Sequence, residues 1–274
     1  MRHLLLFILT MVICAISTSC DDDIRDVEEV VGVEEPIDLE VRLERIDLSE
    51  TIDGTPTSSI AINYDANQRI DAVVIEGGSS FQMTYAANNR LVAIEETGGG
   101  ITKSTALIYD NNTITARSTA SDGSQQEKIL RIDLQNRIDR AITYDLNSAG
   151  NRTEVRRLQY LYTENFNVSR INDLSANGNT VLGYTEFTYV FNNNPFRDMN
   201  DVIRFLIFDE FVPYTRYLPA TQRDYERVGG SFIESRSTVY TYQLQEDQFP
   251  SSRAVETTTA AGTQTNFEFF IYQP

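Results

Sequence analysis

The side chains of this chain that could support catalysis are nearly all carboxylates. The only histidine is His3, and the two cysteines, Cys14 and Cys20, also lie within the first twenty residues. If the chain is cleaved before Cys20, the remainder has no histidine and no free thiol, which removes Ser-His-Asp and Cys-His catalysis and zinc sites of the usual kind. Two acids facing each other across a cleft would still suffice for glycoside hydrolysis.

Acids in apolar surroundings are the candidates for that chemistry. Asp209 and Glu210 lie in an apolar segment where desolvation would raise their pKa values, and Glu186, Glu234 and Glu268 lie in aromatic stretches. In a chain with 40 acids, some will adjoin aromatics by chance, so we favour solvated or arginine-paired acids. The sequence therefore predicts no catalytic residue and no enzyme activity.

Turns rich in oxygen ligands raise the question of calcium. Residues 145–148 (Asp-Leu-Asn-Ser) and 173–177 (Asp-Leu-Ser-Ala-Asn) offer such ligands, but neither has the acidic order and distal glutamate of an EF-hand. Asx turns explain both segments better. No metal site and no cofactor is predicted.

Tyrosine is the remaining residue type with binding potential. Tyr214, Tyr217 and Tyr225 cluster beside Pro213 and Pro219, and tyrosine ring faces bind sugars and peptides. Tyrosine is equally at home in strands, where it packs on cross-strand neighbours. We expect mainly packing, with these three tyrosines as a weak ligand-binding candidate.

The start of the chain has the pattern of an export signal. About thirteen mostly apolar residues, 4–16, follow Arg2 and are too few to span a bilayer as a helix. Small residues 17–19 (Ser-Thr-Ser) then precede Cys20, which resembles a lipobox, although Ser17 stands where that motif usually has an aliphatic residue. The resemblance implies a signal peptide over 1–19, lipidation of Cys20 and attachment to the outer membrane; the alternative is an ordinary cleaved signal peptide.

An acidic segment follows Cys20. Asp21, Asp22 and Asp23 begin a run of acids that continues to Pro36, and such a segment stays extended and solvated. It predicts a tether over 20–36, and its first acids resemble the surface-export signal of Bacteroidetes lipoproteins; a generic linker is the alternative. The formal net charge of −17 disfavours nucleic-acid partners.

Residues 37–274 have the pattern of one all-β domain. Alternating apolar residues lead to Asn/Asp-rich turns such as 65–68, 86–89 and 133–136, each followed by arginine and a new apolar run. The unit repeats about every 21–24 residues, the length of a hairpin, and glycine-containing turns lie between units. An antiparallel β-meander of tandem hairpins is predicted, forming a curved sheet or a partly closed barrel.

One segment departs from this regularity after Asn194-Pro195. Apolar residues between Asp198 and Val212 fit helical spacing, with Asp198 or Asn200 as N-cap. A short helical insertion is predicted near 198–212. An aromatic strand is the alternative.

The Tyr-Asp turns at 64–65, 109–110 and 144–145, with Asn-Arg at 89–90 and 136–137, resemble short YD-repeats. With the lipobox and the Asn194-Pro195 break, the chain is similar to a group of uncharacterised Bacteroidetes lipoproteins with a porin-like, curved-sheet fold. That resemblance implies a fold but no reaction.

Three functions remain after these exclusions. The leading hypothesis is a membrane-anchored envelope or surface lipoprotein that binds a ligand or partner without catalysis, with a glycan or another envelope protein as candidates. The alternatives are a carboxylate-dependent hydrolase such as a glycosidase, and a purely structural lipoprotein.

Overall fold

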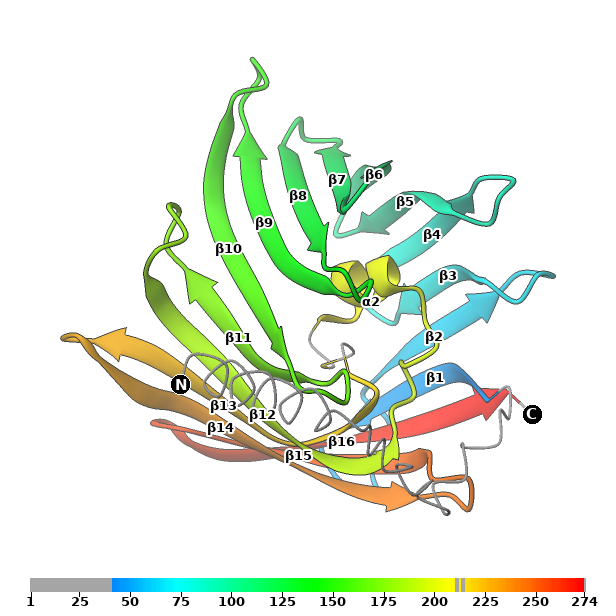
Figure 1. Ribbon diagram of the computed structural model, residues 1–274. Helices are drawn as coiled ribbons and strands as arrows, with labels where there is room; N and C mark the ends of the chain where they lie inside the picture. The colour runs from blue at the N-terminus through cyan, green and yellow to red at the C-terminus, as the bar shows by residue number, and fades with distance from the viewer. Residues whose placement is uncertain (1–40, 210–211, 213–214, 274) are drawn as a thin grey trace, which may run out of the picture. The chain divides into compact units, whose positions relative to one another are not determined.

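A computed structural model describes residues 41–209, 212 and 215–273, which form an antiparallel β-barrel (Figure 1). Sixteen strands follow one another around the ring, each paired with its neighbours in sequence, and the last pairs with the first. The predicted meander is confirmed, and the ring is closed. The signal peptide, Cys20 and the acidic tether lie outside the described residues, so those assignments stay predictions.

The strands are β1 (Arg42–Ser49), β2 (Ser58–Tyr64), β3 (Ile70–Ile75), β4 (Ser80–Tyr85), β5 (Leu91–Gly98), β6 (Ile101–Asp110), β7 (Thr113–Ala120), β8 (Gln125–Ile132), β9 (Ile138–Leu146), β10 (Arg152–Tyr162), β11 (Val168–Leu174), β12 (Val181–Asn193), β13 (Tyr217–Val228), β14 (Ser231–Leu244), β15 (Pro250–Thr259) and β16 (Gly262–Gln273).

The turns differ between the two ends of the barrel. At one end, the turn after β2 is closed by bonds from Asp65 N to Arg69 O (2.9 Å) and from Gln68 N to Asp65 O (2.9 Å). Gln68, Asn89 and Asn136 take positive φ values of 65°, 63° and 61° at the equivalent place in their hairpins, as a type I turn with a bulge requires. We call this end the asparagine rim and the opposite, glycine-containing end the glycine rim.

A tyrosine–carbonyl contact recurs along the asparagine rim. Near the end of seven of the eight even-numbered strands, a tyrosine hydroxyl donates to a backbone carbonyl at the start of the preceding strand. The pairs are Tyr64 with Leu43, Tyr85 with Ile70, Tyr109 with Leu91, Tyr162 with Ile138, Tyr189 with Val168, Tyr242 with Pro219 and Tyr272 with Pro250. Strand β8 has Ile132 in place of the tyrosine. The repeated spacing in the sequence therefore corresponds to a repeated hydrogen bond.

Closure depends on the pairing of β1 with β16. Ile46 lies opposite Phe270, 224 positions later, and both side chains are buried. Phe267 and Phe269 alternate with Phe270 and point to the outer face. Closure leaves neither β1 nor β16 with an unpaired edge.

The connection between β12 and β13 folds into the barrel and contains helix α2 (Asp201–Ile207), which lies within the ring of strands in Figure 1. Its Val202, Ile203 and Phe205 are buried in the same apolar cluster as the inward residues of the strands. Asn200 is the N-cap, as predicted, and its side chain accepts from Val202 N (2.9 Å). The helix is shorter than the predicted 198–212: it spans Asp201–Ile207, and Phe208 is its C-cap. We call residues 194–209 the plug.

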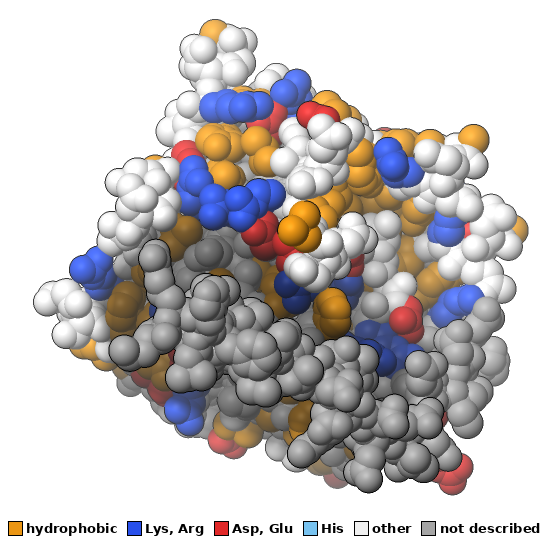
Figure 2. All heavy atoms as spheres, in the orientation of Figure 1, with side chains coloured by type: hydrophobic (Ala, Val, Ile, Leu, Met, Phe, Trp, Pro, Cys, Tyr) orange, Lys and Arg blue, Asp and Glu red, His pale blue; other side chains and the backbone are white. Residues whose placement is uncertain are grey.

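The inner and outer faces of the strands differ in polarity. An inward row across β7–β10 holds Ile114, Leu130, Ala141 and Leu158. An outward row across β4–β8 is polar throughout, with Gln82, Glu95, Ser104, Thr119 and Gln125. Figure 2 shows charged and other polar side chains interspersed with apolar ones on the visible face. Elsewhere the outer face carries exposed apolar side chains, among them Val74, Ile108 and Val239.

Among the described residues, no helix is both long enough and apolar enough to cross a membrane.

The tyrosine–carbonyl contacts predict a measurable contribution to stability. Tyr109→Phe removes the donor to Leu91 O (2.8 Å) and leaves a carbonyl of a fully buried residue without this partner, so we expect a loss of about 1–2 kcal/mol in the free energy of unfolding. Urea denaturation measures it. Tyr144→Phe, on the outer face, is the matched control, and equal effects of the two substitutions would show that the contact contributes nothing.

Candidate functional site

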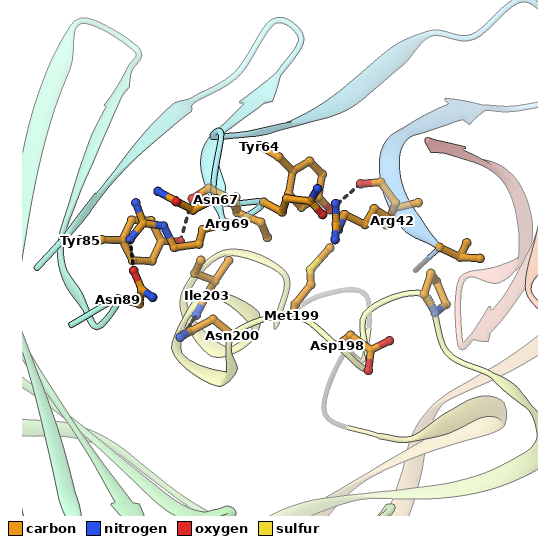
Figure 3. Close-up of a pocket in the computed structure, with 15 residues that line it drawn as sticks. Arg42, Tyr64, Asn67, Arg69, Tyr85, Asn89, Asp198, Met199, Asn200 and Ile203 are labelled. Atoms are coloured by element: carbon orange, nitrogen blue, oxygen red, sulfur yellow. Dashed lines mark hydrogen bonds between the residues drawn. The ribbon is translucent and has the colours of Figure 1, made fainter. Parts of the chain in front are cut away.

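A cavity beside the plug lies at the asparagine rim, between the start of the plug and the first hairpins (Figure 3). We call it the rim pocket. It has a volume of about 370 Å³, within the range of small-molecule sites. Its lining residues are Val41, Arg42, Leu43, Tyr64, Asn67, Gln68, Arg69, Ile70, Tyr85, Asn89, Pro195, Asp198, Met199, Asn200 and Ile203.

One wall is formed by two adjacent hairpin turns. Strands β3 and β4 pair, so the turns that contain Asn67 and Asn89 lie side by side. Arg69 connects them: its Nε donates to Asp65 (2.8 Å), its Nη1 donates to Asn89 Oδ1 (2.8 Å), and its guanidinium stacks on the ring of Tyr85 at 4.4 Å. This wall is therefore held rigidly by one arginine.

The plug supplies the opposite wall. Its start is fixed by buried Asn194, whose Nδ2 donates to Thr215 Oγ1 (3.0 Å) and whose Oδ1 accepts from Phe196 N (3.0 Å). In Figure 3 the side chain of Met199 extends toward Tyr64 and Arg42, and Asn200 lies below Ile203. The pocket thus combines an apolar interior with a polar edge.

The hydroxyls of the two tyrosines in the pocket are used for structural hydrogen bonds. Burial raises the pKa of Tyr64 to about 12, with the positive charge of Arg42 acting against the shift, and burial likewise raises the pKa of Tyr85 to about 12. The hydrogen bond from Arg69 is the main cause of a lowered pKa for Asp65. Both hydroxyls therefore stay protonated at neutral pH and donate to backbone carbonyls.

Four side-chain amides of the pocket have polar atoms left for a ligand: those of Asn67, Gln68, Asn89 and Asn200. Among the described residues, the structure records no hydrogen bond of the Asn67 or Gln68 amide, or of the NH2 groups of Asn89 and Asn200, whose oxygens are engaged. Each of these groups can donate, and two can also accept. The pocket offers directional hydrogen bonds and no nucleophile.

The acids singled out from the sequence do not form one site. Glu186 and Glu234 lie on the outer face of the barrel, whereas Glu268 points inward and is paired with Arg253 at 2.8 Å. Asp209 lines a cavity inside the barrel, and Glu210 lies outside the described residues.

The tyrosines singled out from the sequence are dispersed. Tyr217 and Tyr225 lie near opposite ends of β13, eight residues or about 27 Å apart. Tyr217 packs edge-on against Phe191, while Tyr225 stacks on Tyr184. Tyr214 lies outside the described residues, so the structure does not bring these tyrosines together.

The two turns considered for calcium use side-chain oxygens for local bonds. Asn147 Oδ1 accepts from the backbone N–H of Ala149 and Asn151, and Asn177 Oδ1 accepts from that of Asn179. Within the described part of the chain, no group of three or more His, Cys, Asp or Glu residues is placed to hold a metal ion.

The rim pocket was missed by the sequence analysis. Residues 65–68 and 86–89 were correctly predicted as turns and Asn200 as a helix cap. Their second role, as residues that line a pocket, was not predicted. Their convergence depends on the plug folding back toward these turns, and no local pattern in the sequence indicates that.

The fold is a closed sixteen-stranded antiparallel barrel with an internal helix. A scan against known protein families finds no match, and neither does a search of curated proteins. Among solved structures, the chain is similar to a porin-like protein from Bacteroides uniformis ATCC 8492, with 13% identity, a TM-score of 0.41, and coverage of 84% of this chain and 98% of that one. It is also similar to a porin-like protein from Bacteroides vulgatus ATCC 8482, with 14% identity, a TM-score of 0.43, and coverage of 85% and 99%.

The raised pKa values of Tyr64 and Tyr85 predict how stability depends on pH. Each hydroxyl ionises near pH 12 in the folded chain and near 10 when unfolded, so the folded state retains these protons longer. Their contribution is complete below pH 10 and is lost as the pH rises from about 10 to 12. Tyrosinate absorbance of folded and urea-unfolded protein checks this; uniform titration near pH 10 in the folded protein would contradict it, and Tyr85→Phe should remove one late-titrating group.

Proposed function

We propose that this chain is a non-catalytic protein of the bacterial cell envelope, anchored by a lipid on Cys20, that binds a glycan at the rim pocket. The observation that carries the proposal is the convergence of four side-chain amides on one pocket. Among its described lining residues, Asp198 is the single acid, so the pocket lacks the acid pair that a glycosidase needs.

The amides favour an uncharged, polyhydroxylated ligand. Neighbouring sugar hydroxyls both donate and accept, and the amides of Asn67 and Gln68 offer both functions in one plane. Two cations, Arg42 and Arg69, line the pocket. Arg69 is already paired with Asp65 at 2.5 Å, so it has little attraction left for an anionic ligand. The ring of Tyr64 and the side chain of Met199 offer apolar surface for the carbon face of a sugar.

The interior and exterior of the barrel support a binding role over a conducting one. The plug fills part of the barrel with buried apolar side chains such as Ile203, and the outer row across β4–β8 is polar. The description "porin-like" belongs to the two similar structures. Here we assign the barrel the role of a rigid support for binding sites.

Envelope location is proposed from the sequence of the first 36 residues. Cys20 and the acids at 21–23 supply the anchor and the surface-export signal. A purely structural lipoprotein and a carboxylate-dependent hydrolase are the competing functions, and the glycan-binding experiment below distinguishes them.

Binding is tested with a glycan array followed by calorimetry on the glycans that are retained. Asn67→Ala combined with Asn89→Gly removes two amides, and glycine suits the positive φ of 63° at residue 89. We expect at least a tenfold loss of affinity. Asn136→Gly, at the equivalent position of a distant hairpin with φ 61°, is the matched control and should bind normally. Retention of no glycan would favour the structural role, and hydrolysis that is lost on changing one carboxylate would establish the enzyme.

Anchoring is tested by protease shaving of intact cells that express the wild type or Cys20→Ala. We expect the wild type to sediment with membranes and to be digested from outside, and the variant to be released in soluble form. A membrane-bound but protected wild type would place the protein on the periplasmic side. Soluble behaviour of both would overturn the lipid anchor.

A further inference from the structure

The rim pocket is apolar at its floor and polar at its edge. Leu43, Ile70 and Ile203 line the pocket and are almost fully buried, so they form its floor. The four side chains that carry the amides are exposed, so they lie at its edge. A ligand that fits must therefore place an apolar group deeper in the pocket than its hydrogen-bonding groups.

A sugar hydroxyl does not suit this floor. The hydroxyls of Tyr64 and Tyr85 already donate to the carbonyls of Leu43 and Ile70, at 2.8 Å and 2.7 Å. A ligand hydroxyl placed there would give up its hydrogen bonds to water without a replacement, which is costly. A methyl group carries no such cost, and its burial is favourable.

The amides at the edge offer more donors than acceptors. Asn200 Oδ1 accepts from two backbone N–H groups of helix α2, at 2.9 Å and 3.4 Å, and Asn89 Oδ1 accepts from Arg69 at 2.8 Å. Among the described residues, these two amides keep their NH2 groups for a ligand, whereas Asn67 and Gln68 keep both amide groups. Four NH2 groups thus stand beside two amide oxygens. A ligand with a carbonyl, which accepts and does not donate, matches this excess.

Asn200 lies where the floor and the edge meet. It follows Met199 and caps helix α2, and Figure 3 shows it next to Ile203. Because the N–H groups of the helix hold its Oδ1, its NH2 group has a fixed orientation beside these apolar side chains. A fixed donor next to apolar surface suits a carbonyl that carries a methyl group.

We propose that the rim pocket selects sugars that carry an acetamido group, with the methyl against Met199 and Ile203 and the carbonyl oxygen accepting from Asn200 Nδ2. The N–H of the acetamido group donates to an amide oxygen, that of Asn67 or Gln68. This inference rests on the proposed function, because it names the class of glycan bound at the same site. Asn200 and Met199 are then the residues that determine specificity.

Calorimetry and saturation-transfer NMR with methyl glycosides test the proposal on the full chain carrying Cys20→Ala. We expect N-acetylglucosamine to bind about tenfold more tightly than glucose, because it adds a hydrogen bond and a buried methyl group. N-formylglucosamine keeps the carbonyl without the methyl, so its affinity should lie between the two. Saturation transferred from the protein should be strongest at the acetyl methyl.

The other outcomes separate this inference from glycan binding in general. Equal affinity for glucose and N-acetylglucosamine would overturn acetamido selection and leave glycan binding in place. Tighter binding of glucuronate would do the same, since it would assign selection to the positive charge of Arg42. Failure of every glycan, on the array and in solution, would overturn the proposed function together with this inference.

Asn200→Asp isolates the donor. Aspartate caps a helix as well as asparagine does, so the helix should persist while a carboxylate oxygen replaces the NH2 group. We expect binding of N-acetylglucosamine to weaken about tenfold, because the carboxylate repels the carbonyl oxygen. Glucose should bind as before, since its hydroxyls can donate to a carboxylate. Met199→Ala should narrow the gap between N-acetylglucosamine and N-formylglucosamine.

Asn147→Asp is the matched control. It makes the same exchange in the turn between β9 and β10, where Asn147 Oδ1 also accepts from two backbone N–H groups. Circular dichroism and thermal unfolding check that each variant folds. A preference for N-acetylglucosamine that is unchanged in folded Asn200→Asp would overturn the assignment of the donor, and an unchanged gap in Met199→Ala would overturn the methyl contact.

Discussion

The barrel depends on the contact between a tyrosine hydroxyl and a backbone carbonyl, repeated around the asparagine rim. A buried carbonyl at the start of a strand needs a donor, and a phenol near the end of the following strand supplies one while its ring fills space inside the barrel. Because the same contact recurs in seven hairpins, each hairpin is held to the next at the same height. The asparagine rim is therefore regular around most of the ring.

Much of this regularity can be predicted from the sequence. The alternating apolar residues, the turns at 65–68, 86–89 and 133–136, and the cap at Asn200 are local features, and local chemistry determines them. Closure is different, because Ile46 and Phe270 meet across 224 positions and no short pattern encodes their pairing. The extent of helix α2 was overestimated because the apolar residues that follow it are equally compatible with irregular packing.

The rim pocket was hidden for a related reason. Its wall exists only once β3 and β4 are paired, which brings the turns of Asn67 and Asn89 side by side. In the sequence these two residues are 22 positions apart, among many other polar residues. The residues that supply the amides of the rim pocket were noted in the sequence, but their roles in turns and in a helix cap already accounted for them. Sequence reasoning finds the first role of a residue readily and a second role only with difficulty.

The plug lies between two cavities of the barrel. Its start, near Asn200, faces the rim pocket, and its end, near Asp209, lines a cavity with cations and apolar surface. Buried residues between them, Ile203 and Phe205, join the plug to the wall of the barrel. A ligand in the rim pocket would therefore contact a segment that the interior of the barrel holds in place.

Closure by β1 and β16 also determines how the barrel responds to mechanical force. Arg42 begins a strand that is hydrogen-bonded along both sides, to β16 and to β2. A pull transmitted through the chain before Arg42 acts along the axis of this strand, so it loads both ladders in shear and many hydrogen bonds resist at once. A hairpin at a free edge would instead unzip one bond at a time. The closed ring thus makes the point where the chain enters the barrel one of its strongest parts.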